Sequence, residues 1–163
     1  MTEKEMFIDG WDREYGTTMK VLRAFPTTKP DMKPAEHSRS ARELAWVFVG
    51  GERWLEGIIK GDVLAGGENP GKAPSSMNDI LKEYEKTHAE ILKKVKQLPE
   101  EQFSKPIKFP TGPKKLGEIP RNQAAWMTLM DEVHHRGQFS VYLRMAGAKV
   151  PSIYGPTADE PWM

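Results

Sequence analysis

The sequence predicts an all-α protein, a four-helix bundle with long crossover loops. Two observations carry this prediction. Four segments repeat apolar residues at the three- and four-residue spacing of an amphipathic helix, and the segments between them are rich in proline and glycine. No segment shows a convincing strand pattern, and 163 residues are enough for one compact core. We therefore expect a single domain over residues 1–163.

The first helix is expected over residues 3–24. Its apolar face is predicted to carry Phe7, Trp11, Tyr15, Thr18 and Leu22. The helix should end at Phe25, because the residue before a proline avoids the helical region and Pro26 follows. An extended connection over residues 27–36 then leads to a second helix that begins near Ser38.

One face of the second helix is predicted to carry Leu44, Val47, Gly51, Trp54 and Ile58. Because Val47 shares this stripe with large apolar residues, we expect it in the core. Residues 61–74 contain four glycines and two prolines, which predicts a loop.

The third helix is expected to begin at Ser76, with Asp79 three residues later giving a start that resembles a capping box. It continues with a seam for packing against other helices, formed by Leu81, Tyr84, His88, Ile91, Val95 and Leu98. A histidine in such a seam is more often a core residue satisfied by a hydrogen bond than a metal ligand.

Residues 99–120 contain five prolines, so we expect that no helix runs through this region, with short extended pieces possible around residues 107–109. The fourth helix is expected over residues 121–146 and should stop at Gly147. Its apolar residues lie nearly all round, at Met127, Leu129, Met130, Val133, Val141 and Leu143. Such a helix is buried on several sides or packs against a partner chain.

The composition excludes several functions. Lysine and arginine total 24 against 23 acidic residues, a net charge of +1 that gives no basic excess for nucleic acid or an anionic membrane. The longest apolar run, residues 44–49, is too short to span a bilayer, and the acidic N-terminus lacks a signal-peptide pattern, so we expect a cytoplasmic protein. Without cysteine, any thiol chemistry requires a thiol from outside the chain.

Asp131 and His135 are the sequence's candidates for a metal site. Residues four apart share one face of a helix, so this carboxylate and imidazole can hold a divalent ion or form an ion pair with each other. Two ligands are too few for a tight site, because catalytic zinc usually has three protein ligands. His134 points about 100° away from His135 and is expected to make a packing or polar contact.

Three segments resemble the DinB-like, damage-inducible family: ARELAWVFVGGERWLEGIIKGD at residues 41–62, HHRGQFSVYLR at 134–144 and AGAKVPSIYGPTADEP at 146–161. The resemblance implies a helical bundle, a homodimer, and zinc or nickel held by three histidines. It also implies a relation to transferases that use bacillithiol or mycothiol.

Only His135 matches the implied ligand set unchanged. The ligand on the second helix falls on Val47, and the first histidine of the His-x-x-x-His pair falls on Asp131. We therefore expect no tightly bound metal, and a stress-response homodimer that binds a small ligand or acts without metal. Its pocket would involve Val47, Trp54, His88, His134 and Gln138. The alternative is a thiol S-transferase or hydrolase that uses zinc or nickel on Asp131, His135 and a third ligand, with a low-molecular-weight thiol.

Overall fold

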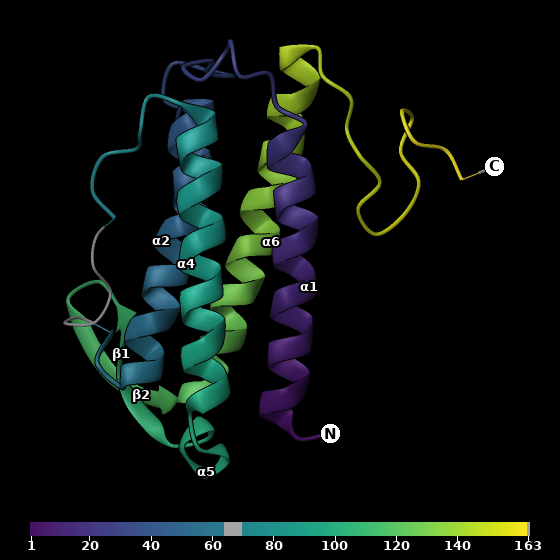
Figure 1. Cartoon of the computed structure of the whole chain (residues 1–163). Helices are drawn as coiled ribbons and strands as arrows, with labels where there is room; N and C mark the ends of the chain where they lie inside the picture. Colours follow the sequence, from purple (N-terminus) through teal and green to yellow (C-terminus); the bar gives the residue numbers. More distant parts are fainter. Residues whose placement is uncertain (64–69, 163) are drawn as a thin grey trace.

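The computed structural model of the chain describes residues 1–63 and 70–162, and it is predominantly helical (Figure 1). Its long helices are α1 (Glu3–Arg23), α2 (Ala41–Lys60), α4 (Met77–Gln97) and α6 (Arg121–Ala146). A short helix α5 (Glu100–Phe103) and an antiparallel pair of strands, β1 (Pro106–Gly112) and β2 (Lys115–Pro120), connect α4 to α6. The predicted mainly helical class is confirmed. Among the described residues, no helix is long and apolar enough to cross a membrane.

Local side-chain chemistry fixes where the helices begin and end. Thr2 and Ser40 form capping boxes at the starts of α1 and α2, and the Ser76 hydroxyl caps α4. Helix α2 thus begins after Ser40, slightly later than the predicted start. At the other ends, α2 and α6 stop at Gly61 and Gly147, whose φ angles of 81° and 76° suit glycine.

The order in which the long helices pack was left open by the sequence. Helices α1 and α2 each pack against α4 and α6. In Figure 1, α1 and α6 run in one direction and α2 and α4 in the other. Because α2 and α4 run the same way, the chain is not a simple up-and-down arrangement.

In the region between α4 and α6, no helix runs through the prolines, as predicted. The short helix α5 begins directly after Pro99, a residue tolerated in front of a helix, and ends before Pro106. The short extended pieces expected near residues 107–109 are confirmed, and they belong to a full hairpin. Ile107 and Phe109 alternate with exposed residues along β1 and cover one end of the helices.

The core runs along the helices in two clusters, one around Leu22, Phe48, Tyr84 and Phe139 and one around Phe7, Trp11 and Ile91. Of the residues predicted in buried stripes, Trp11, Leu44 and Ile91 are buried, whereas Val47, Trp54, Leu81 and Val133 are only partly buried. Val47 is therefore not fully buried as expected, although it packs against the core cluster around Leu22 and Phe48. Its side chain lies at the edge of the core, where it lines a groove.

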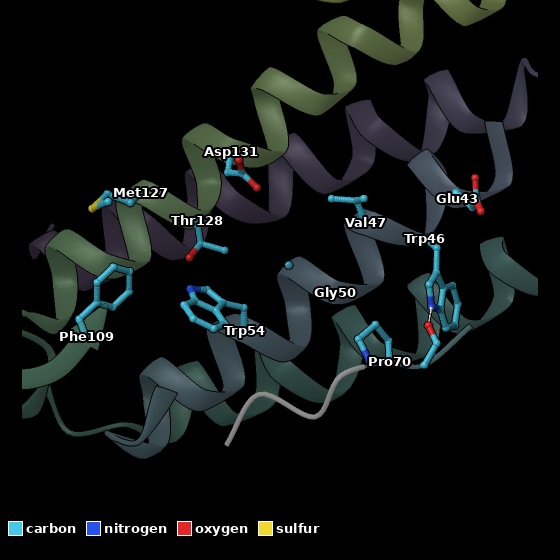
Figure 2. A pocket seen from close by; sticks show the side chains of 12 residues that line it. Glu43, Trp46, Val47, Gly50, Trp54, Pro70, Phe109, Met127, Thr128 and Asp131 are labelled. Atoms are coloured by element: carbon cyan, nitrogen blue, oxygen red, sulfur yellow. Dashed lines mark hydrogen bonds between the residues drawn. The ribbon is translucent and has the colours of Figure 1, made fainter. Parts of the chain in front are cut away.

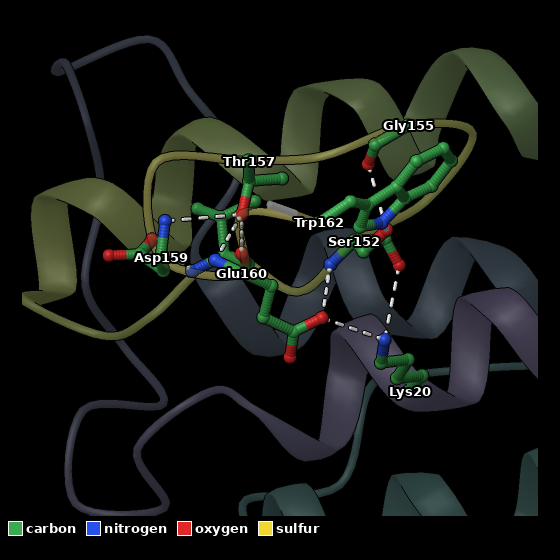
Figure 3. A network of polar contacts seen from close by, with 8 residues as sticks. Lys20, Ser152, Gly155, Thr157, Asp159, Glu160 and Trp162 are labelled. Atoms are coloured by element: carbon green, nitrogen blue, oxygen red, sulfur yellow. Dashed lines mark hydrogen bonds and ion pairs between the residues drawn. The ribbon is translucent and has the colours of Figure 1, made fainter.

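The segment after α6 folds back beside α1 (Figure 3). Lys20 of α1 donates to the backbone oxygen of Ser152 at 3.2 Å and forms an ion pair with Glu160 at 3.0 Å. The indole nitrogen of Trp162 donates to the Ser152 hydroxyl at 3.0 Å. Apolar contacts add to this, because Val150 is buried in the core and Ile153 packs against it, whereas Trp162 stays largely exposed.

Candidate functional site

A groove of about 540 Å³ lies between α2 and α6 (Figure 2). Its volume falls within the range of small-molecule sites, about 300 to 1,000 Å³. Its walls are mostly apolar and come from α2, α6, β1 and the segment before α4: Trp46, Val47, Gly50, Gly51, Trp54, Pro70, Phe109 and Met127 among others. Among the described residues that line it, two carry a full charge, and both are carboxylates, Glu43 and Asp131.

Glycine keeps the floor of the groove open. A Cβ built on Gly51 would have no atom within 4 Å, so the space above this helical position is unfilled. A Cβ on Gly50 would only touch Pro70, at 3.6 Å. The predicted α2 face is thus divided: Leu44 and Ile58 at its ends are buried, whereas its middle faces the groove.

Asp131 and His135 lie together, as their spacing predicted. The His135 ring nitrogen Nδ1 is 2.9 Å from the Asp131 backbone oxygen and 3.2 Å from its carboxylate Oδ2. The Asp131 side chain is exposed, and an exposed pair of this kind stabilises a helix by about 0.3 to 0.5 kcal/mol.

A smaller chamber continues the groove inward. The two cavities share Val47, Gly51, Thr128 and Asp131. The other lining residues of the chamber come from α1, α2 and α6, and they are Trp11, Phe48, Glu52, Glu132 and His135. The structure therefore brings Val47, Asp131 and His135, the three positions in the implied ligand set, around one chamber.

Behind the chamber, Glu52 of α2 and His88 of α4 form a buried pair. His88 Nδ1 is 2.8 Å from Glu52 Oε1, and His88 Nε2 is 3.0 Å from Asp12 Oδ1. The ring also stacks on Tyr15 at 3.7 Å. Both ring nitrogens thus contact carboxylates, which only accept, and a doubly protonated imidazole satisfies both contacts.

Burial and these contacts shift the pKa of each partner. Burial lowers the pKa of His88, but the hydrogen bonds and charges of Glu52 and Asp12 outweigh it and raise the pKa above its ordinary value. Burial raises the pKa of Glu52 to about 7, although His88 acts against this shift.

A second polar network surrounds Glu132 and Arg136 of α6. Glu132 Oε1 accepts hydrogen bonds from the hydroxyls of Thr18 at 2.7 Å and Tyr84 at 2.9 Å. Burial raises the pKa of Glu132 above its ordinary value, although these two hydrogen bonds act to lower it. Arg136 is 1% exposed and forms an ion pair with Glu14 at 2.6 Å. Networks of this kind fix the relative positions of α1, α4 and α6.

His134 and Gln138 do not join the groove or the chamber. They lie exposed on α6, with His134 Nε2 2.9 Å from Gln138 Nε2. Of the predicted pocket residues, Val47 and Trp54 line the groove, whereas His88 lies behind Glu52.

The donor set around the chamber does not fit a resident zinc or nickel ion. Val47 has only carbon in its side chain, and both nitrogens of His88 are held by carboxylates. Among residues 1–63 and 70–162, no group of three or more His, Cys, Asp or Glu side chains is arranged to hold a metal. Three protein ligands are the usual minimum for a catalytic zinc site.

The comparisons with known proteins decide the family. A model of the DinB family matches residues 1–162. The chain belongs to the DinB family. The Bacillus subtilis protein YrdA is 24% identical to this DinB-family chain over 159 residues, which cover 94% of the chain and 89% of YrdA.

Two crystal structures share the fold of this DinB-family protein. A DinB-like protein from Bacillus cereus superposes with a TM-score of 0.79 at 21% identity, covering 92% of this chain and 97% of that one. The DinB-like protein YjoA from Bacillus subtilis gives 0.73 at 21% identity, covering 91% and 97%. At this identity the likeness shows the fold alone.

Several residues that line the groove and the chamber were not among the candidates from the sequence. Thr128 and Phe109 line the groove, and Glu52 and Glu132 line the chamber. A pattern for Glu52 was present, because it lies between the buried Phe48 and Leu55 at helical spacing. A carboxylate on an apolar stripe is a candidate functional group, since unpaired charges are rarely buried.

Proposed function

We propose that this DinB-family protein, a four-helix bundle, binds a small and largely apolar organic ligand in the groove between α2 and α6, without a tightly bound metal. The observation that carries the proposal is the groove itself, with Trp46, Trp54 and Phe109 as aromatic walls and Gly51 as an open floor. Aromatic side chains around a concave site supply most of the binding area for small ligands.

A neutral aromatic probe tests this function, and 2-(2-naphthyl)ethanol is of suitable size. The Gly51→Leu variant fills the floor and is expected to weaken binding about tenfold or more, since each displaced CH₂ contact is worth about 0.8 kcal/mol. Calorimetric titration gives the Kd. The indole N–H resonances of Trp46 and Trp54 should shift with ligand while that of Trp162 stays fixed.

Gly16→Leu is the matched control. Gly16 is also a helical glycine without an atom within 4 Å of a built Cβ, but it lies on the exposed side of α1. Both substitutions raise helix propensity by about 0.5 to 1 kcal/mol, so a general effect on stability would be the same in both variants. Equal probe affinity for the native protein, Gly51→Leu and Gly16→Leu would contradict a ligand site in the groove.

The proposed functional unit is a homodimer that packs through α6. Its exposed face carries a line of residues at helical spacing: Met130, His134, Gly137, Val141 and Met145. Three of these residues, Met130, Val141 and Met145, are large apolar side chains that are exposed to solvent in the single chain. A two-fold interface between two copies of the chain would cover them.

Light scattering at micromolar concentration is therefore expected to give twice the chain mass of 18.5 kDa. Val141→Asp should give the monomer mass, because it places a charge in the centre of the proposed interface. Leu116→Asp is the control, since Leu116 on β2 is 54% exposed against 55% for Val141 but lies away from α6's outer face. A native monomer, or dissociation by both variants, would count against this interface.

A further inference from the structure

The inner chamber has room for a single small polar group. Its volume of about 10 Å³ corresponds to one water-sized group. It opens to the groove past Val47, Gly51 and Asp131, which line both cavities. A ligand whose body lies in the groove can therefore place one terminal group in the chamber.

Glu52, which lines this chamber, carries a buried carboxylate oxygen without a partner. Glu52 is 2% exposed, and its Oε1 contacts His88, but Oε2 has no hydrogen-bond partner in the described part of the chain. Leaving a buried acceptor unsatisfied is destabilising by about 1 to 3 kcal/mol, and more when the group is charged. Such an atom is expected to receive a donor in the functional state.

The charges around the chamber also lack a cation. Three carboxylates line the chamber, those of Glu52, Asp131 and Glu132, whereas its described lining includes no lysine or arginine. Buried charges of one sign favour a compensating partner.

We propose that the chamber binds the ammonium group of a primary amine, with the apolar body of that amine in the groove. This inference rests on the proposed function of the groove. A primary ammonium has the size of the chamber, and it supplies donors to Glu52 Oε2 and Asp131. The Trp11 ring in the chamber wall offers a further attraction for a cation. A carboxylate ligand would meet like charges, and a trimethylammonium group would be too large.

Three probes with one aromatic body test the proposal: 2-(2-naphthyl)ethylamine, its neutral alcohol and 2-naphthylacetate. The native protein should bind the amine at least about tenfold more tightly than the alcohol, the ratio expected for a charge-assisted hydrogen bond. The carboxylate should bind more weakly than the alcohol. The N,N,N-trimethyl form of the amine should lose the preference because it does not fit the chamber.

Glu52→Gln should reduce the preference for the amine over the alcohol to less than about threefold, because it removes the negative charge that favours the ammonium. The glutamine oxygen still accepts from His88, whereas its amide nitrogen replaces the acceptor Oε2. Glu90→Gln is the matched control, because it removes one negative charge from α4 at a residue that lines neither cavity. If Glu52→Gln does not fold, Asp131→Asn serves as a second chamber variant, with the same direction of change.

The outcomes separate the two proposals. Equal affinity of the native protein for amine and alcohol, with both lost in Gly51→Leu, overturns the ammonium site and leaves the ligand groove intact. An amine preference that survives Glu52→Gln, or Asp131→Asn where that variant is used, also overturns the ammonium site. Binding of neither probe to the native protein overturns both proposals.

Discussion

The double variant Val47→His/Asp131→His is expected to bind zinc or nickel and to be strongly stabilised by it, whereas the native protein is not. Val47, Asp131 and His135 line one chamber, so the two changes would place three imidazoles around it. A metal that binds only the folded state at a thousandfold excess over its Kd stabilises by about 4 kcal/mol. Without metal the variant should be less stable than the native protein, because it places unpaired imidazoles in a partly buried chamber.

Thermal unfolding of tag-free protein, with and without added metal, measures this effect directly. Asp131→His is the control and should respond much less than the double variant, because it offers only two imidazoles. Val47→His keeps Asp131 beside two imidazoles, so its metal-dependent shift should lie between those of Asp131→His and the double variant. A large metal-dependent shift in the native protein, or one equivalent of zinc after purification, would show that another group supplies the missing ligand. The alternative of a metal-dependent thiol transferase or hydrolase would then be favoured.

Arg136→Met should lower the free energy of unfolding by about 3 to 5 kcal/mol. Arg136 is 1% exposed, and its guanidinium contacts the Glu14 carboxylate at 2.6 Å, the Thr18 hydroxyl at 3.3 Å and the Tyr154 hydroxyl at 2.5 Å. Methionine fills much of the volume but leaves these groups without their cation. Breaking a buried pair from one side carries a penalty of this size. Urea denaturation followed by circular dichroism measures it.

Arg144→Met is the control for this prediction. Arg144 lies on the same helix and forms an ion pair with Asp159, but its side chain is 47% exposed, so the loss should stay below about 1 kcal/mol. Adding Glu14→Gln to Arg136→Met should recover part of the lost stability, because it removes the unpaired charge. If Arg136→Met and Arg144→Met lowered the free energy of unfolding by similar amounts, the buried contacts of Arg136 would contribute little to stability.

Both predictions concern α6, but they concern different faces of this helix. Arg136 points from α6 toward α1 and the C-terminal segment, where it holds elements together. Asp131 and His135 face α2 across the chamber, where the structure leaves space. A lower free energy of unfolding in the Arg136 variant and a change of binding in the Asp131 variant would therefore distinguish structural from ligand-contacting residues on α6.

Local sequence patterns were sufficient for the helices. Apolar spacing located all four long helices, and Gly147 marked the end of the last one, because helical periodicity and the left-handed cap act over a few residues. The pairing of Asp131 with His135 was likewise predictable, since four-residue spacing on a helix alone brings them together. The absence of a nitrogen ligand at position 47 was also evident from the sequence.

Contacts between distant segments decided the rest. The hairpin after α5 was only partly visible, because its strands are stabilised by each other and by packing on the helices. Val47 and Trp54 looked like core residues on an apolar stripe, and only the position of α6 and of Gly51 turns that stripe into a groove. Glu52 and His88 are 36 positions apart, so no local pattern could show their contact. Sequence determined which residues are helical and which could coordinate metal, whereas the packing of α1, α2, α4 and α6 determined which of them share a cavity.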